Sequence, residues 1–307
     1  MWKIQPVSKE TYNCFQFLAA TVARFFNCDY RLMMLELWGF LYDEKSGGTI
    51  SDKLKLCWNY KTKKRSQLLS FHGLSFEIIA SEKINTLQYI YDYFEQSPVA
   101  VFIDSFDCPW LPFYRKLHRP HALLITNKEI ETFSFLDQYS SKSSVQEVAT
   151  GFVESNTANL IVFTRNENEL AFTLRDEIAI RLDEWEQYGF SHYEKFVSEM
   201  KNTLDISTEI YDNPAASKLI MHLKNLAEDR TNFIEALDLF EERLSIDLRP
   251  AKSSLCDIAT NYEKLRAYII KCAFSKRTHK PEIVANALDS IYLSEQKVYE
   301  RIRVLVN

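Results

Sequence analysis

The 307-residue sequence predicts an α+β protein with an all-helical C-terminal region. Up to about residue 170, short runs rich in β-branched and aromatic residues alternate with helical patterns, and five of the six glycines lie in this part. Beyond it, apolar residues recur at intervals of three and four positions, which is typical of helices that bury one face. We therefore expect two domains, residues 1–170 and residues 171–307.

The elements expected from these patterns follow in chain order. Strands are expected at residues 67–71, 74–80, 99–104, 122–126, 130–136 and 160–164. Helices are expected at residues 174–188, 193–204, 216–226, 232–244, 255–273 and 282–306. Proline disfavours helical backbone at the residue before it, so breaks between helices are expected at Asn213-Pro214, Arg249-Pro250 and Lys280-Pro281.

Composition and charge argue against several classes of protein. A net charge of -5 argues against nucleic acid as the main partner, because binding to phosphates requires a basic surface. No apolar run is long enough for a membrane span, and the N-terminal segment lacks the basic start and apolar core of a signal peptide, so we expect a cytoplasmic protein. The six cysteines include no C-x-x-C pair, which indicates free thiols and no metal site.

One cysteine stands where a helix is expected to begin. In the segment YNCFQFLAA, residues 12–20, Asn13 suits the N-cap position and Cys14 falls in the first turn. There the unpaired amide N–H groups and the positive end of the helix dipole stabilise a thiolate, which is the nucleophilic form of cysteine. Cysteine is also among the residues most often buried, so Cys14 is either a core thiol or a nucleophile, and the second interpretation requires a base.

The best candidate base lies in a predicted β-hairpin, in which two apolar runs flank a polar turn at residues 127–129. A turn centred on the last of these places His121 directly opposite Asp137, with both side chains on one face. A carboxylate there fixes the imidazole tautomer, so that the other ring nitrogen can accept a proton from a thiol. Cys14, His121 and Asp137 are therefore a candidate triad, although a one-residue change of register would separate the pair. His118 is the alternative base.

Three segments of the first domain resemble the butirosin-type aminoacyl-transfer proteins. They are NCFQFLAATVARFFNCDYRLMMLELWGFLYD, PVAVFIDSFDCPWLPFYRKLHRPHALLITN and FSFLDQY. The family pattern is a Cys opening the first helix, an Asp-x-x-x-Leu-Pro-Tyr-like segment after a strand, a His starting the next strand and an Asp ending its hairpin partner. Here these positions are Cys14, Asp104 with Leu111-Pro112-Phe113, His121 and Asp137. The resemblance covers about residues 10–165 and implies a papain-like cysteine-protease fold.

Papain-like enzymes often stabilise the oxyanion with a glutamine upstream of the cysteine. Gln5 is the nearest upstream glutamine, but it lies farther from Cys14 than that pattern expects. The side-chain candidates for the oxyanion donor are therefore Gln5, Asn13 and Gln16, beside the backbone N–H of Cys14.

Amide formation requires an activated acyl group. The sequence has no G-x-x-x-x-G-K-[ST] loop, which argues against ATP as a direct cosubstrate, and we expect no bound cofactor. The resemblance implies that the acyl group arrives as a phosphopantetheine thioester on an acyl carrier protein. Because carrier proteins are acidic, basic docking residues are expected, and the candidates are Lys61, Lys63, Lys64, Arg65, Arg115, Lys116 and Arg119. The basic run Lys61, Lys63, Lys64 and Arg65 is explained equally well as a solvated loop.

Three functions remain open on these residues. The resemblance implies an amide synthetase that forms an acyl-Cys14 intermediate and transfers the acyl group to an amine in non-ribosomal peptide or polythioamide natural-product biosynthesis. A cysteine peptidase or thioesterase would use the same triad with water as the acceptor. A non-catalytic binding protein would use the papain-like domain as a scaffold. The aromatic segments at residues 38–42 and 106–113 either line a substrate pocket or belong to the core.

Overall fold

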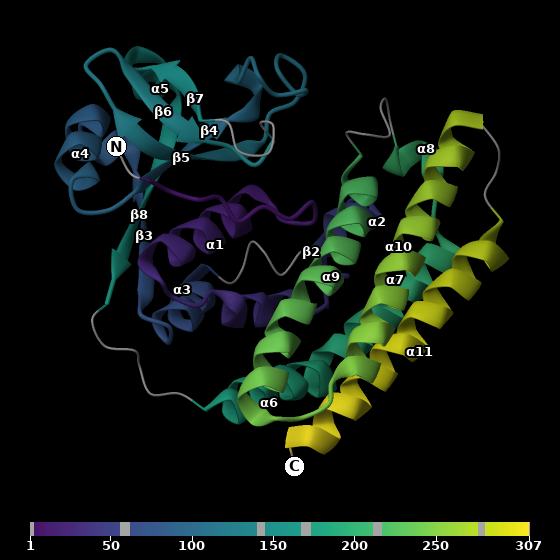
Figure 1. Ribbon diagram of the computed structural model, residues 1–307. Coiled ribbons are helices and arrows are strands. Elements are labelled where there is room, and N and C mark those ends of the chain that lie inside the picture. Colours follow the sequence, from purple (N-terminus) through teal and green to yellow (C-terminus); the bar gives the residue numbers. More distant parts are fainter. Residues whose placement is uncertain are drawn as a thin grey trace. The chain divides into compact units, whose positions relative to one another are not determined.

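The chain forms two compact units in the computed structural model, which describes residues 3–55, 62–139, 145–166, 173–210, 217–275 and 280–306. The first unit comprises Met1–Tyr30 and Ser66–Ala171, and the second comprises Arg31–Arg65 and Phe172–Asn307. Figure 1 follows the chain by colour from the purple N-terminus to the yellow C-terminus. Residues 31–65 therefore belong with the C-terminal helices, whereas the sequence places them in the first domain.

The first unit contains a six-stranded sheet in which every neighbouring pair of strands is antiparallel. The strand order is β3-β8-β4-β5-β6-β7. The strands are β3 Leu74–Ala80, β4 Val99–Asp104, β5 Pro120–Lys128, β6 Thr132–Leu136, β7 Gln146–Ala149 and β8 Thr157–Arg165. β4 and β5 lie between other strands, and their long apolar runs are buried on both faces.

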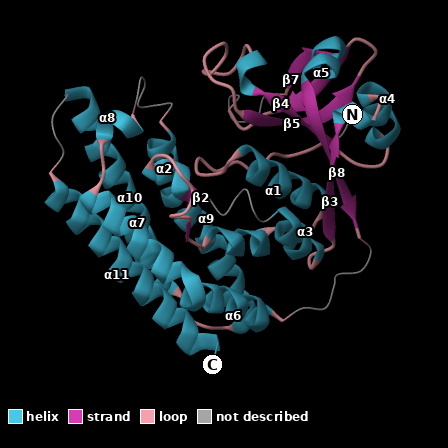
Figure 2. Cartoon of the chain, turned by 180° about the vertical axis from the view of Figure 1, so that it is seen from behind, coloured by secondary structure: helices cyan, strands magenta, loops and turns pink. Residues whose placement is uncertain are grey.

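Helices lie on both sides of this sheet (Figures 1 and 2). α4 Thr86–Phe94 and α5 Thr150–Asn156 contribute to a buried apolar cluster with side chains of β4, β5 and β6. On the other side α1 Cys14–Phe26 contacts β5, and its Phe15 ring packs edge-on against Phe76 of β3. The short turns η3 Ser81–Lys83 and η4 Ser105–Asp107 follow β3 and β4. This packing fixes the start of α1 relative to β5.

The structure agrees with most of the expected strands. Two of them coincide with β3 and β4, and three more overlap β5, β6 and β8. The strand expected at residues 67–71 is wrong, because these residues end the helix α3 Thr62–Ser70, where Leu68 and Leu69 are fully buried. A short apolar run has no period that distinguishes a buried strand from a buried helix. β7 was not expected, since QEVA lies at the sheet edge and none of its residues is buried.

In its described residues, the second unit contains helices and one short pair of strands. Its long helices α9 Lys218–Leu244, α10 Arg249–Ser275 and α11 Pro281–Val306 lie side by side (Figure 2). The other elements are η1 Arg31–Leu37, β1 Leu41–Tyr42, α2 Ile50–Lys53, β2 Leu54–Lys55, α6 Leu174–Glu184, η5 Trp185–Gly189, α7 Phe190–Asn202 and α8 Ile206–Glu209. The described residues after 172 form helices and no strand, as the sequence predicts. Among the described helices, none combines the length and the apolar character that a membrane span requires.

One continuous helix, α9, replaces the two helices expected at residues 216–226 and 232–244. The residues between them contain no glycine or proline, and Ala227 and Arg230 continue the buried face. Pro250 and Pro281 stand at the starts of α10 and α11, where the missing N–H removes no helical hydrogen bond. The break expected at Asn213-Pro214 lies outside the described residues.

A buried ion pair joins α9 to α11. Arg230 Nε lies 2.6 Å from Glu295 Oε1, and both side chains are fully buried. Arg230 also donates to the carbonyl oxygens of Leu37 and Gly39. Trp38 Nε1 donates to Glu295 Oε2 at 2.9 Å. Trp38 is the first residue of the aromatic segment 38–42, which the sequence assigns either to a substrate pocket or to the core. In the structure the Trp38 side chain belongs to the core.

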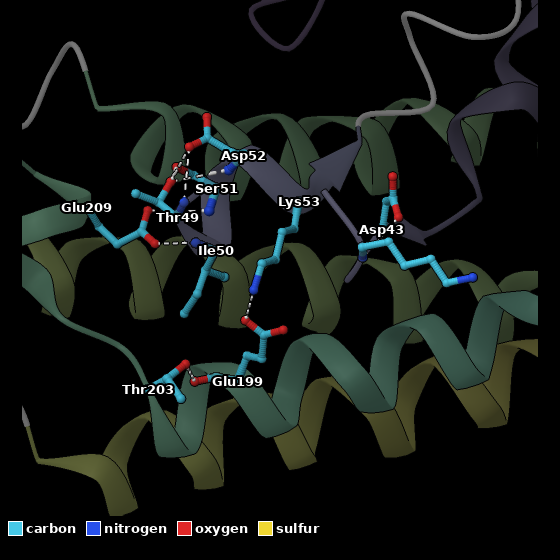
Figure 3. Close-up of polar contacts among 10 residues, drawn as sticks. Asp43, Thr49, Ile50, Ser51, Asp52, Lys53, Glu199, Thr203 and Glu209 are labelled. Carbon is cyan, nitrogen blue, oxygen red and sulfur yellow. Dashed lines mark hydrogen bonds and ion pairs between the residues drawn. The ribbon is translucent and has the colours of Figure 1, made fainter. Parts of the chain in front are cut away.

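Charged side chains also tie α2 to α7 and α8 (Figure 3). Glu209, the last residue of α8, accepts a hydrogen bond from the backbone N–H of Ile50 at 2.6 Å. Lys53 Nζ donates to Glu199 Oε2 of α7 at 2.7 Å. These polar contacts, like those of Trp38, connect residues 31–65 to partners that come after residue 172. They give the physical reason why this segment belongs to the second unit.

We predict that Glu295→Ala lowers the free energy of unfolding by about 3–5 kcal/mol, because it leaves the Arg230 guanidinium buried without its counter-charge. Asp289→Ala is the matched control on the same helix, since Asp289 pairs with Lys201 at an exposed site and is expected to contribute no more than about 1 kcal/mol. Urea unfolding followed by tryptophan fluorescence measures both variants. Equal losses would contradict the structural importance of the buried pair.

Candidate active site

Cys14 is the first residue of α1, and a capping box fixes this helix start. Asn13 is the N-cap: its Oδ1 accepts from Gln16 N at 3.0 Å, while Gln16 Oε1 accepts from Asn13 N at 2.9 Å. Both the helix start and the N-cap are those that the sequence predicts. An α-helix provides no intrahelical acceptor for the amide N–H of its first residue, so the Cys14 N–H is a candidate oxyanion donor.

Both members of a His-Asp pair are buried at one end of the sheet. His121 is the second residue of β5, opposite Ile103 of β4, and Asp137 directly follows the last residue of β6. His121 Nε2 lies 2.9 Å from Asp137 Oδ2, and the two side chains are 3% and 0% exposed. Because Asp137 occupies Nε2, Nδ1 is the ring nitrogen left for a contact with Cys14.

Hydrogen bonding holds a proton on this imidazole. Burial, the largest influence, lowers the pKa of His121, but hydrogen bonds to Asp137 and Cys14 and electrostatic interactions with these two residues raise it to about 9. The structure thus brings all three residues of the predicted triad together. An imidazolium that persists at neutral pH is the partner that stabilises a thiolate.

The hairpin register differs from the expected one. Leu124 pairs with Leu136, and extending this register places Asp137 opposite Leu123 and not opposite His121. The difference amounts to two residues. Since side chains alternate between the two faces of a strand, a shift of two keeps His121 and Asp137 on the same face. The predicted contact between His121 and Asp137 is therefore present, although the strand pairing from which it was predicted is wrong.

The turn of the hairpin also lies further along the chain than expected. β5 continues to Lys128, β6 begins at Thr132, and Ile130 between them is almost fully exposed. A β-bulge shifts the register between Ile125 and Asn127. The extra residue is Thr126, which is buried and donates from Oγ1 to a carbonyl oxygen of β6 at 3.3 Å.

Two further donors hold the carboxylate of Asp137. Trp110 Nε1 donates to Oδ2 at 2.8 Å, and the backbone N–H of Tyr139 donates to Oδ1 at 2.8 Å. Sequence reasoning assigns no role to Trp110 beyond the aromatic character of its segment. Its position between a strand end and Leu111-Pro112 is the only feature of the sequence that could have indicated it.

Asp104, the other acidic residue of the family-like pattern, holds a loop closed. Its carboxylate accepts from the backbone N–H groups of Phe106 and Arg119 at 2.9 and 3.1 Å and contacts His118 Nδ1 at 2.7 Å. Burial raises the pKa of Asp104, but these hydrogen bonds and the nearby His118 outweigh it and lower the pKa below its usual value. Because the His118 side chain is 70% exposed and stacks on Phe106, His121 fits the role of base better.

A second cysteine near Asp137 is not equipped to act as a nucleophile. Cys108 is fully buried, and its Sγ contacts the backbone oxygen of Asp104 at 3.3 Å. Burial is the main cause that raises the pKa of the Cys108 thiol to about 12, with a smaller contribution from the charge of Asp137. A protonated, enclosed thiol is inert.

The structure separates the three oxyanion candidates. Val7 N donates to Thr21 Oγ1, and Arg24 donates to the carbonyl oxygen of Pro6, so the N-terminal segment runs antiparallel to α1. Gln5 is exposed and lies toward the far end of the helix, at least about 10 Å along the axis from Cys14. Gln5 is therefore not placed to assist Cys14. Asn13 and Gln16 belong to the capping box at the start of α1, in which their side-chain oxygens act as acceptors.

Three basic docking candidates lie in the loop at residues 105–119. Arg115 and Lys116 are exposed, and Arg119 is half-buried. The guanidinium groups of Arg115 and Arg119 lie over the rings of Phe106 and Phe113, at 5.1 and 5.0 Å from the ring centres. These contacts hold the two arginines in place on the loop.

The other basic run is placed only in part. Lys61 lies outside the described residues. Lys63, Lys64 and Arg65 belong to α3, but their side chains are outside the description. The structure therefore leaves their docking role as an expectation.

In the part of the chain that the structure describes, no three His, Cys, Asp or Glu side chains form a cluster that could hold a metal ion. No protein-family model matches the chain, and no curated protein matches it. The chemistry of the site is therefore inferred from its own side chains.

We predict that Asn13→Ala destabilises the first unit by about 1 kcal/mol, because it removes the acceptor that caps Gln16 N. Asn13→Ser retains an N-cap oxygen, so we expect it to lower the stability by no more than about a few tenths of a kcal/mol. Thermal or urea unfolding compares the two variants. A loss of equal size in both would mean that the capping oxygen does not stabilise α1.

We predict that Asp137→Asn lowers the pKa of His121 by about one to three pH units, because the imidazolium loses its charged acceptor. The His121 ring resonance, assigned with His121→Gln, should titrate near pH 9 in the wild type and lower in the variant. A raised pKa stabilises the folded state fully below about pH 6.5, and this contribution is lost as the pH rises through about 9.

The unfolding free energy of the wild type should therefore exceed that of Asp137→Asn by about 1–3 kcal/mol at pH 6, and the excess should shrink toward pH 9.5. Urea unfolding across this range measures the difference. A wild-type His121 that titrates near its ordinary value would contradict this account.

Proposed function

We propose that this protein is an amide-forming acyltransferase that carries its acyl group on Cys14. The observation that supports this most is the contact of the partly exposed Cys14 with the buried pair of His121 and Asp137. A nucleophile at a helix start, a base in contact with it and a carboxylate that orients the base are the parts that acyl transfer requires. Each comes from a different element: α1, β5 and the residue after β6.

The first half of the reaction forms a thioester on Cys14. The thiolate attacks the carbonyl carbon of an acyl thioester, and the backbone N–H of Cys14 stabilises the oxyanion of the tetrahedral intermediate. Collapse of the intermediate breaks the bond to the carrier sulfur. His121 gives its proton to this leaving thiolate, and Asp137 holds the ring in the required tautomer.

The second half transfers the acyl group to an amine. The amine attacks the acyl-Cys14 carbonyl, and neutral His121 takes the proton that the nitrogen loses. The new amide forms as the bond to the cysteine sulfur breaks, which regenerates the thiolate and the imidazolium. With water in place of the amine, the same steps give a thioesterase or peptidase.

The acyl donor is proposed to be a phosphopantetheine thioester on an acyl carrier protein. Such a donor is already activated, which agrees with the lack of a phosphate-binding loop motif in the sequence. Arg115, Lys116 and Arg119 provide positive charge for an acidic carrier on the loop that also contains Trp110. We propose a cytoplasmic location, where free thiols such as the described cysteines persist.

Within the butirosin-type family, the sequence resembles the amide synthetase of closthioamide assembly. This resemblance implies a carrier-bound, thioamidated aryl oligo-β-alanyl chain as the acyl group and a short diamine as the acceptor. Both remain proposals that follow from the likeness, and a diamine is accordingly the first acceptor to test.

We predict that incubation with acyl carrier thioesters adds one acyl group to the wild type and none to Cys14→Ala. Cys256→Ala is the matched control, since Cys256 is an exposed free thiol on α10 and its loss should leave the adduct unchanged. His121→Ala should slow acylation by about a hundredfold or more, because it removes the base and the acid. Intact-mass spectrometry measures the adduct.

The products separate the three functions. Amide formed on addition of a diamine supports the synthetase, and free acid in its presence supports a thioesterase. Absence of any adduct on Cys14, together with a Cys14 that resists alkylation near neutral pH, would instead support a binding protein on a papain-like scaffold.

A further inference from the structure

We propose that Trp110 is a positioning residue of this site, which holds the Asp137 carboxylate in the orientation that binds His121. The catalytic consequence rests on the proposed function, whereas the positioning itself does not. Trp110 belongs to neither the predicted triad nor the family-like pattern of residues.

The hydrogen bonds to Asp137 leave its carboxylate no freedom to rotate. Trp110 Nε1 and His121 Nε2 both bond to Oδ2, at 2.8 and 2.9 Å. The other oxygen, Oδ1, accepts from the backbone N–H of Tyr139 at 2.8 Å. A rotation that released Trp110 would also weaken the bond to His121, because the two donors share one oxygen.

Burial makes this third donor necessary. The Asp137 side chain is fully shielded from solvent, so water cannot replace a missing hydrogen bond to the carboxylate. The indole N–H stabilises the negative charge without adding a positive one. His121 therefore remains the cationic partner of Asp137, which a lysine or arginine at position 110 would change.

The indole of Trp110 is itself fixed by its neighbours. Its ring lies 5.0 Å from the ring of Phe135 on β6 and 5.8 Å from the ring of Phe152 on α5. Cys108 and Leu111, on either side of it in the chain, are buried. The donor is therefore held by packing before it meets the carboxylate, as a positioning residue must be.

Trp110→Phe in the full-length chain tests the proposal, since it keeps an aromatic ring and removes the N–H. We expect the His121 titration midpoint, followed by NMR, to fall below about 9, because an unfixed carboxylate binds the imidazolium less well. Alkylation of Cys14 by iodoacetamide at pH 7, followed on its peptide by mass spectrometry, should slow by about tenfold. Phe152→Leu is the matched control, because it loosens one side of the indole packing but keeps the indole donor, so both readouts should change much less than in Trp110→Phe.

A second measurement is made on the wild-type protein, and Trp110→Phe serves only to assign the indole resonance. The indole Nε1–H resonance of Trp110 should titrate together with the His121 ring resonance, since both donors share Oδ2. An indole resonance that does not follow His121, or a midpoint in Trp110→Phe that stays near 9 or rises, would overturn the proposal. Equal effects of Trp110→Phe and Phe152→Leu would overturn it as well, because they would show a packing role alone.

These outcomes are separate from those of the acyl-transfer test. If wild-type protein forms no acyl adduct but Trp110→Phe lowers the His121 midpoint, Trp110 positions Asp137 and the proposed function fails. If the wild type forms the adduct while Trp110→Phe leaves the midpoint and the alkylation rate unchanged, the function stands and the positioning role fails.

Discussion

A single carboxylate, that of Asp137, sets the protonation of the candidate site. Buried charge is costly unless it meets donors, and this one meets an imidazole, an indole and a backbone amide. The imidazole donor is His121, and the negative charge beside it keeps a proton on a ring that burial alone would render neutral. The sheet, the loop at residues 105–119 and the start of α1 serve to bring the partners of this carboxylate within reach.

The sequence predicts the parts of the site that rest on local rules. The N-cap at Asn13 and the helix start at Cys14 follow from capping chemistry, which involves neighbours in the chain. β4 coincides with an apolar run bounded by proline and aspartate. The helices that the structure describes after residue 172 follow from long amphipathic periods in the sequence. In each case the residues that decide the structure lie within a few positions of one another.

Features that depend on distant partners are not predictable in this way. Residues 31–65 belong to the second unit because of contacts such as the hydrogen bond from Trp38 to Glu295. These two residues are far apart in the sequence. The run at residues 67–71 has the composition of a strand, but packing makes it helical. Trp110 meets Asp137 only after a loop closes. The expected hairpin pairing was two residues off, and the contact survives because strand geometry repeats every two residues.

The β-bulge at Thr126 determines which side chains of β5 and β6 share a face of the sheet. Without this extra residue, the pairing of Lys128 with Phe133 would continue unbroken, and Asp137 would stand opposite Leu124. Leu124 is three positions from His121, so the carboxylate and the imidazole would point to opposite sides of the sheet. The extra residue Thr126, whose buried hydroxyl is bonded to β6, thus decides by parity whether the acid and the base lie on the same side of the sheet.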